Sequence, residues 1–173
     1  CAISGAELSV KPLMLDTPTH DFTQTHAMSM DELLDAMSAG AQAVNRDANI
    51  ILLGEMGIGN STISSALAAS IFGGDVADWV GAGTGSDEKA IAHKISVIKA
   101  GIAKHGLCSD LSALLAFGGR EQAAICGAIL AARAASIPVL LDGFICTAAA
   151  APLYSLSSEL LEHCLVGHKS AEL

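Results

Sequence analysis

The chain has 173 residues, of which 51% are hydrophobic, 16% charged and only 3% aromatic, and its net charge is −9. This length suits one α/β domain, and the composition predicts a sizeable core built mainly from Ala, Leu, Ile and Val. The acidic balance argues against a surface that follows nucleic-acid phosphates or anionic lipid, so neither nucleic acid nor a membrane is expected as a partner.

The cysteines indicate the compartment. There are five, widely spaced and without a Cys-x-x-Cys pair, which fits neither a disulfide framework nor a zinc site and favours a reducing cytoplasm. Cys146 and Cys164 are predicted to be small core residues. The most apolar stretch, from Gln122 to Leu153, is interrupted by charged residues and a proline, so we expect no transmembrane span.

The first elements are defined by caps and apolar runs. Ser29 and Glu32 form a capping box, which predicts a helix from Ser29 to about Val44. The run 50–53 predicts a strand, and the next helix is expected to begin at a cap on Asn60 or Ser61 and to end at Gly73-Gly74. Trp79 and Val80 are interpreted as the end of another strand.

The second half of the chain continues the alternation of helices and strands. Helices are predicted at 88–104 after caps on Ser86 and Asp87, at 110–117, at 121–135 and at 144–153, and strands at 137–141 and 164–166. Such alternation implies right-handed βαβ units. The predicted fold is therefore a Rossmann-like α/β fold of three layers, with a mainly parallel sheet and helices on both faces.

Two glycine-rich loops follow predicted strand ends and precede predicted helices. The first runs from Gly54 to Thr62 and the second from Gly81 to Asp87. Backbone N–H groups at the start of a helix bind phosphate, and ligands of open α/β sheets bind at the carboxyl ends of the strands. Together the loops predict an anion site.

The first loop nearly matches a P-loop, but Asn60 stands where the lysine is required. Without that ammonium group the loop lacks its contact with the β- and γ-phosphates, which disfavours NTP hydrolysis. The alternative is a plain strand-to-helix turn that requires glycine. Glu55 favours a functional loop, because its carboxylate would face the crevice and could orient a cationic group.

The second loop, Gly81 to Gly85, is a weak dinucleotide fingerprint because its third glycine comes too early. Lys94 lies nine residues beyond Gly85; it either reaches back over the crevice or is an ordinary surface lysine. The histidines lack the spacing of metal ligands, so no metal site is expected.

Five motifs in this order resemble one enzyme family. They are Leu53 to Thr62 (LGEMGIGNST), Val80 to Asp87 (VGAGTGSD), Phe117 to Ile129 (FGGREQAAICGAI), Ile137 to Ala149 (IPVLLDGFICTAA) and His168 to Glu172 (HKSAE). The chain from about Asp21 to Glu172 resembles the nicotinate-nucleotide:dimethylbenzimidazole phosphoribosyltransferases. The resemblance implies transfer of ribose 5-phosphate from nicotinate mononucleotide to 5,6-dimethylbenzimidazole in cobalamin biosynthesis, by a homodimer that uses no cofactor or metal.

The resemblance also implies roles for individual residues. Glu55 is expected near the reacting base in a supporting catalytic role. The residues expected to hold the phosphate and ribose are Gly57, Gly83, Thr84, Gly85 and Lys94, and Ser170 is expected to approach the same nucleotide.

The family pattern places the main general base and part of the benzimidazole pocket outside this sequence. We therefore expect residues 1–173 to form a single nucleotide-binding domain, a fragment of a longer enzyme that is poorly active alone. A non-catalytic nucleotide-binding module that keeps the phosphate loops is the alternative. An oxidoreductase that uses a dinucleotide is disfavoured, because no acidic residue is clearly placed to bind an adenosine ribose.

Overall fold

The centre of the fold is a parallel sheet of three strands in the order β1-β2-β3. The structure, a computed structural model, describes residues 5–81 and 87–170. The strands are β1 (Ile51–Leu53), β2 (Val139–Leu141) and β3 (Cys164–Val166). Leu52 pairs in register with Leu140, which pairs with Leu165. The predicted α/β class with a parallel sheet is confirmed.

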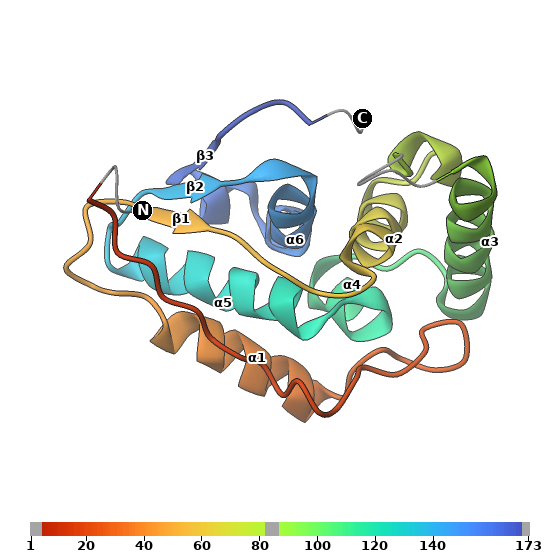
Figure 1. The fold of residues 1–173 in the computed structure, drawn as a ribbon, viewed down its shortest axis with the longest axis horizontal. Coiled ribbons are helices and arrows are strands. Elements are labelled where there is room, and N and C mark those ends of the chain that lie inside the picture. The colour runs from red at the N-terminus through yellow and green to blue at the C-terminus, as the bar shows by residue number, and fades with distance from the viewer. Residues whose placement is uncertain (1–4, 82–86, 171–173) are drawn as a thin grey trace.

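Helices connect and cover these strands (Figure 1). They are α1 (Met30–Gln42), α2 (Asn60–Phe72), α3 (Glu88–His105), α4 (Asp110–Phe117), α5 (Arg120–Ala134) and α6 (Gly143–Leu156), with short 3-10 helices at Val76–Trp79 and Ser158–Leu161. In Figure 1, α5 runs beneath the sheet and α1 lies against the outer side of α5, whereas α2 and α3 stand to one side. The loop that follows β1 leads from the sheet to α2.

The predicted capping box opens α1 as expected. The Ser29 hydroxyl accepts a hydrogen bond from the Glu32 amide at 3.2 Å, and the Glu32 carboxylate accepts one from the Ser29 amide at 2.9 Å. The other Glu32 oxygen pairs with Arg120 at 2.6 Å. Because Arg120 is the first residue of α5, this cap also connects α1 to α5.

The strand predicted at Trp79–Val80 is wrong, because Val76–Trp79 forms a 3-10 helix. Asp75 caps this turn by accepting from the Ala77 amide at 3.1 Å. The Trp79 indole donates to the Gly73 carbonyl at 2.8 Å, and the Ser65 hydroxyl donates to the Trp79 carbonyl at 2.6 Å. These bonds fold the segment against the end of α2, so the second glycine-rich loop follows a turn and not a strand.

Helices α1 and α5 approach each other at two glycines. A Cβ atom at Gly40 would lie 2.7 Å from the Ala124 Cα and closer still to the Ala124 carbonyl, and one at Gly127 would lie 2.8 Å from the Met37 Cα. Both neighbours are backbone atoms, which cannot move aside independently of their helix. Only glycine allows this close packing.

We expect Gly127→Ala to destabilise the fold by about 3 kcal/mol, because the added methyl group must separate two packed helices. Gly54→Ala is the control, since a Cβ at Gly54 meets nothing within 4 Å. The free energy of unfolding in urea measures both variants. Equal stability of the two would show that α1 and α5 do not pack as closely as described.

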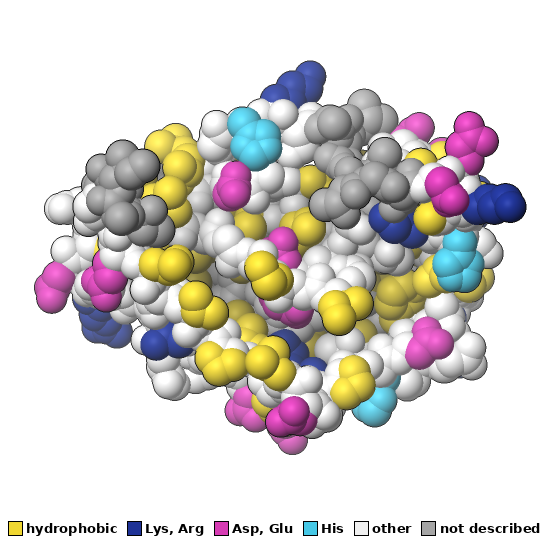
Figure 2. All heavy atoms as spheres, in the orientation of Figure 1, with side chains coloured by type: hydrophobic (Ala, Val, Ile, Leu, Met, Phe, Trp, Pro, Cys, Tyr) yellow, Lys and Arg dark blue, Asp and Glu magenta, His cyan; other side chains and the backbone are white. Residues whose placement is uncertain are grey.

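Alternate residues of the strands point to opposite faces of the sheet. Val139 and Leu141 are buried in the core, whereas Leu52 and Leu165, which share the other face, are 64% and 60% exposed. Hydrophobic side chains are interspersed with acidic ones on the surface seen in Figure 2. Within the described residues, no helix combines the length and apolar character needed to cross a bilayer.

Candidate functional site

A pocket of about 470 Å³ lies at the carboxyl ends of β1 and β2. One wall is the loop after β1 with the start of α2, including Glu55, Gly57 and Asn60, and the other is formed by residues 142–145 after β2. The two neighbouring strand ends therefore meet at one pocket, at the place where an open parallel sheet binds ligands.

The start of α2 forms part of the wall of this pocket. Gly59 is the N-cap and has φ 86°, a left-handed conformation that favours glycine. The first turn of a helix exposes N–H groups and carries the positive end of the helix dipole. The expectation that Asn60 or Ser61 caps this helix is wrong, because the Asn60 side chain turns to Glu55 instead.

Lys94 of α3 adds a positive charge beside the same helix start. Its ammonium nitrogen lies 3.0 Å from the hydroxyl oxygen of Ser61, and Ser61 lines the pocket. This contact turns the Lys94 side chain toward the start of α2, and the role of Lys94 in binding stays a prediction. The Lys94 ammonium group therefore lies beside the first turn of α2, although Lys94 itself lines a second, smaller pocket.

Glu55 provides the opposite charge. It is half-buried, and one oxygen of its carboxylate accepts a hydrogen bond from the side-chain amide of Asn60. Burial raises the pKa of the Glu55 carboxyl, the Asn60 hydrogen bond opposes this rise, and the nearby charge of Glu121 adds to it. The pocket thus places the Glu55 carboxylate, whose proton affinity is increased, near the positive end of the α2 dipole.

The chain after β3 passes close to the second wall of the pocket. The His168 ring nitrogen lies 3.5 Å from a carboxylate oxygen of Asp142, and a Cβ at Gly143 would lie 3.7 Å from the same ring. Ser170 follows two residues later and is partly buried, but it is not among the residues that line the pocket. Gly83, Thr84 and Gly85 lie outside the described residues.

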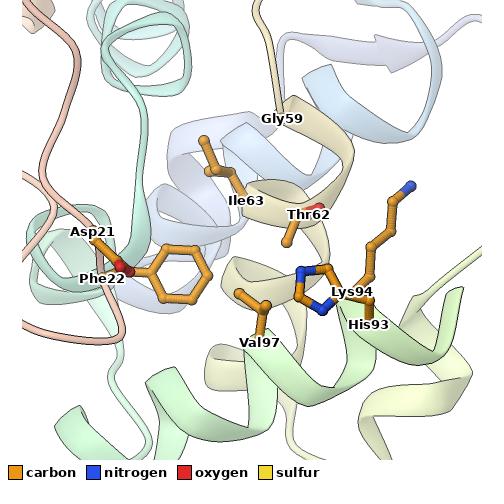
Figure 3. A pocket seen from close by; sticks show the side chains of 8 residues that line it. All are labelled: Asp21, Phe22, Gly59, Thr62, Ile63, His93, Lys94 and Val97. Atoms are coloured by element: carbon orange, nitrogen blue, oxygen red, sulfur yellow. The ribbon is translucent and has the colours of Figure 1, made fainter. Parts of the chain in front are cut away.

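A smaller pocket of about 320 Å³ lies on the other side of Gly59. Figure 3 shows the Phe22 ring, Ile63 and Val97 facing it, with His93 at its edge and the Lys94 side chain extending away from this apolar wall. Asp21 and Phe22 belong to the segment that precedes α1. Their proximity to α2 arises from tertiary packing and has no local signal.

The buried cysteine thiols of the described residues are poorly suited to act as nucleophiles. Cys108, Cys126, Cys146 and Cys164 are free, and burial raises the pKa of Cys126 to about 12 and that of Cys146 to about 11. Such thiols are poor nucleophiles. Cys146 is buried and Cys164 packs against the core, as predicted. Between residues 5 and 170, outside the gap at 82–86, no group of three or more His, Cys, Asp or Glu could hold a metal.

Two acidic residues in or beside the pocket had no role assigned from the sequence. Asp142, which lines the pocket, appeared in the sequence only as part of the motif Ile137 to Ala149. Glu121 of α5 approaches the pocket from behind, because a Cβ at Gly57 would overlap a Glu121 carboxylate oxygen. In the sequence, Glu121 lies in the motif Phe117 to Ile129. That motif does not indicate which of its residues turns toward the first glycine-rich loop.

Comparisons with known proteins agree with these features. A family model described as "Phosphoribosyltransferase" matches residues 1–173. The chain is 55% identical over 172 residues to the nicotinate-nucleotide–dimethylbenzimidazole phosphoribosyltransferase of Rhodobacter capsulatus and 54% identical to that of Roseobacter denitrificans, covering 99% of this chain in each case. It covers 52% and 51% of those proteins, and so spans about half the length of these relatives.

A solved structure shows the same arrangement of elements. The crystal structure of CobT from Thermus thermophilus superimposes with a TM-score of 0.82 at 34% sequence identity, covering 89% of this chain and 48% of that one. The likeness in sequence therefore extends to the fold that builds the pocket.

Proposed function

Because this chain belongs to the phosphoribosyltransferase family of nicotinate-nucleotide–dimethylbenzimidazole enzymes, we propose that its protein transfers ribose 5-phosphate from nicotinate mononucleotide to 5,6-dimethylbenzimidazole. The products are α-ribazole 5′-phosphate and nicotinate, in cobalamin biosynthesis. The chain spans about half of its relatives' length, so the proposal concerns the polypeptide of family length that contains it.

One observation carries this proposal: opposite charges lie close to the start of α2, because Glu55 lines the larger pocket and Lys94, which lines the smaller adjacent pocket, contacts the larger one through Ser61. Lys94 and the first turn of α2 lie together through Ser61, and Glu55 lies in the wall formed by the same loop. Nicotinate mononucleotide has a phosphate at one end and a cationic pyridinium on the ribose at the other. The helix start and Lys94 suit the phosphate, and the carboxylate suits the cationic end.

The reaction is a displacement at the anomeric carbon. The bond between this carbon and the pyridinium nitrogen breaks, and its electron pair leaves with nicotinate. The lone pair of one benzimidazole nitrogen forms the new bond from the opposite face, and the proton on the other ring nitrogen passes to a base. Positive charge builds on the ribose in the transition state, so a fixed carboxylate such as Glu55 lowers the barrier.

The remaining assignments belong to the same proposal. Gly57 and Lys94 hold the phosphate and ribose, together with Gly83, Thr84 and Gly85 of the second loop, and Ser170 approaches the nucleotide from the segment after β3. The main general base comes from outside residues 1–173. The enzyme works as a homodimer in the cytoplasm; light scattering of the purified protein tests the dimer, and cell fractionation tests the compartment.

The proposed activity is tested with the family-length polypeptide, nicotinate mononucleotide and dimethylbenzimidazole, with products identified by mass spectrometry. We expect equal amounts of α-ribazole 5′-phosphate and nicotinate. Binding of the mononucleotide in calorimetry without either product would instead indicate a nucleotide-binding module. Residues 1–173 alone are expected to form product poorly; a rate equal to that of the longer polypeptide would place the base within this chain.

A further inference from the structure

Asn60 has unusual surroundings for the first residue of a helix. It is only 2% exposed, although it lies at the edge of the pocket. Its side-chain nitrogen donates to a carboxylate oxygen of Glu55. Its side-chain oxygen is buried and has no hydrogen-bond partner among the described residues. Buried polar atoms of this kind are uncommon in folded proteins and require an explanation.

Glu121 shares the small space in which Asn60 lies. A Cβ at Gly57 would be 2.6 Å from both polar side-chain atoms of Asn60 and would overlap a carboxylate oxygen of Glu121. The other Glu121 oxygen is 2.8 Å from the Cβ position of Gly119. The Asn60 amide therefore packs between the loop that carries Glu55 and the start of α5, and the missing side chain of Gly57 makes room for it.

We propose that Asn60 is a positioning residue, whose amide nitrogen holds the Glu55 carboxylate in the orientation needed at the pocket. This inference rests on the proposed transferase function and assigns a task to a residue that the sequence linked to an incomplete P-loop and to a helix cap. A neutral donor suits the task. A lysine at this position would neutralise Glu55, and an aspartate would repel it and offer no N–H.

Several charged or titratable groups surround this pair and affect any pH dependence. They are Glu121 on α5, Asp142 after β2, Cys146 on α6 and, through Ser61, Lys94 on α3. Glu121 and Asp142 disfavour additional negative charge near Glu55, whereas Lys94 favours it. A carboxylate in place of the Asn60 amide would thus join a group of acids that already contains Glu55.

The test compares Asn60→Asp with the unchanged family-length enzyme. We expect kcat to fall by about 100-fold, because a misoriented and repelled carboxylate no longer stabilises the transition state. We expect the KM for nicotinate mononucleotide to change by less than about threefold, since a change confined to kcat marks an interaction made in the transition state. As pH falls, the rate of the variant relative to the parent should rise, because protonation of the new carboxyl restores a donor.

A double-mutant cycle separates positioning from a general structural role. If Asn60 acts through Glu55, Asn60→Asp should cost less than about threefold in a Glu55→Gln background, because interacting residues are non-additive. The same 100-fold loss in both backgrounds, or an effect on KM alone, would overturn the inference. Should Asn60→Asp fail to fold, Asn60→Ser is measured in the same cycle, with the same criterion.

Asn49→Asp is the matched control, because Asn49 is an exposed asparagine outside the pocket. It makes the same chemical change and should leave kcat, KM and the pH profile unaltered. The activity of the unchanged enzyme also distinguishes a failure of the proposed function from a failure of the role inferred for Asn60. An unchanged enzyme that forms no α-ribazole 5′-phosphate contradicts the proposed function, whereas an active enzyme insensitive to Asn60→Asp contradicts only the role of Asn60.

Discussion

Replacing Lys94 with methionine is expected to raise the KM for nicotinate mononucleotide by about 10- to 100-fold, with a smaller effect on kcat. The Lys94 ammonium lies 3.0 Å from the Ser61 hydroxyl at the start of α2, where we place the phosphate. Loss of a charge-assisted hydrogen bond costs about 1.5–3 kcal/mol, which corresponds to this range of affinity. Methionine keeps most of the length and the apolar stem, so initial-rate kinetics report mainly the charge.

Lys104→Met is the matched control for this experiment. Lys104 is exposed near the carboxyl end of α3, the helix that also carries Lys94. The Lys104→Met substitution should leave the KM for nicotinate mononucleotide within about twofold of the parent value, because an isolated surface charge contributes little to binding. A Lys94→Met enzyme with the same KM as this control would show that the phosphate binds elsewhere.

Glu55→Gln is expected to lower kcat by about 100-fold, because a fixed charge beside the cationic ribose is lost. The same change should not reduce stability at neutral pH. Burial raises the pKa of Glu55, so the protonated form is favoured more in the folded protein than in the unfolded chain. Glutamine resembles that form and avoids the burial of a charge. Steady-state kinetics of the parent and of Glu55→Gln measure the change in kcat, and thermal unfolding of the same two proteins measures the change in stability.

The sign of the pH dependence follows from the same shift. A carboxyl with a raised pKa in the folded state stabilises the protein below its unfolded pKa, and this contribution is lost as pH rises through the folded pKa. Above the ordinary range of a glutamate, the unfolding temperature of the parent should therefore fall relative to that of Glu55→Gln. If Glu55→Gln instead became less stable than the parent as pH rises, the result would contradict the raised pKa of Glu55.

Local signals in the sequence predicted most of the secondary structure. Ser29 with Glu32 predicted the start of α1, and the apolar runs predicted β1 and β2, because caps and burial patterns depend on near neighbours. Trp79 and Val80 were interpreted as a strand end because the second glycine-rich loop follows them. The hydrogen bond of Trp79 to Gly73 and that of Ser65 to the Trp79 carbonyl hold Trp79 in a 3-10 turn instead, and bonds of this kind have no signature in the local sequence.

The position of the candidate pocket could be predicted where a glycine-rich loop forms its wall. Glu55 and Gly57 lie in the first glycine-rich loop, and both line the pocket as the loop suggested. Spacing alone left Lys94 undecided, because its contact with Ser61 depends on how α3 packs beside α2. The contributions of Asn60 and Glu121 could not be predicted, since they depend on side-chain directions at a point where α2, α5 and the first loop meet.

The central claim is that one pocket binds a phosphate at the start of α2 and a cationic ribose beside Glu55. A crystal structure of the family-length polypeptide with nicotinate mononucleotide tests it most directly. We predict the phosphate within hydrogen-bonding distance of the Lys94 ammonium and the first amides of α2, with the pyridinium end toward Glu55. A nucleotide bound in the apolar pocket beside Phe22 and His93, or with its phosphate away from Lys94, would contradict the claim.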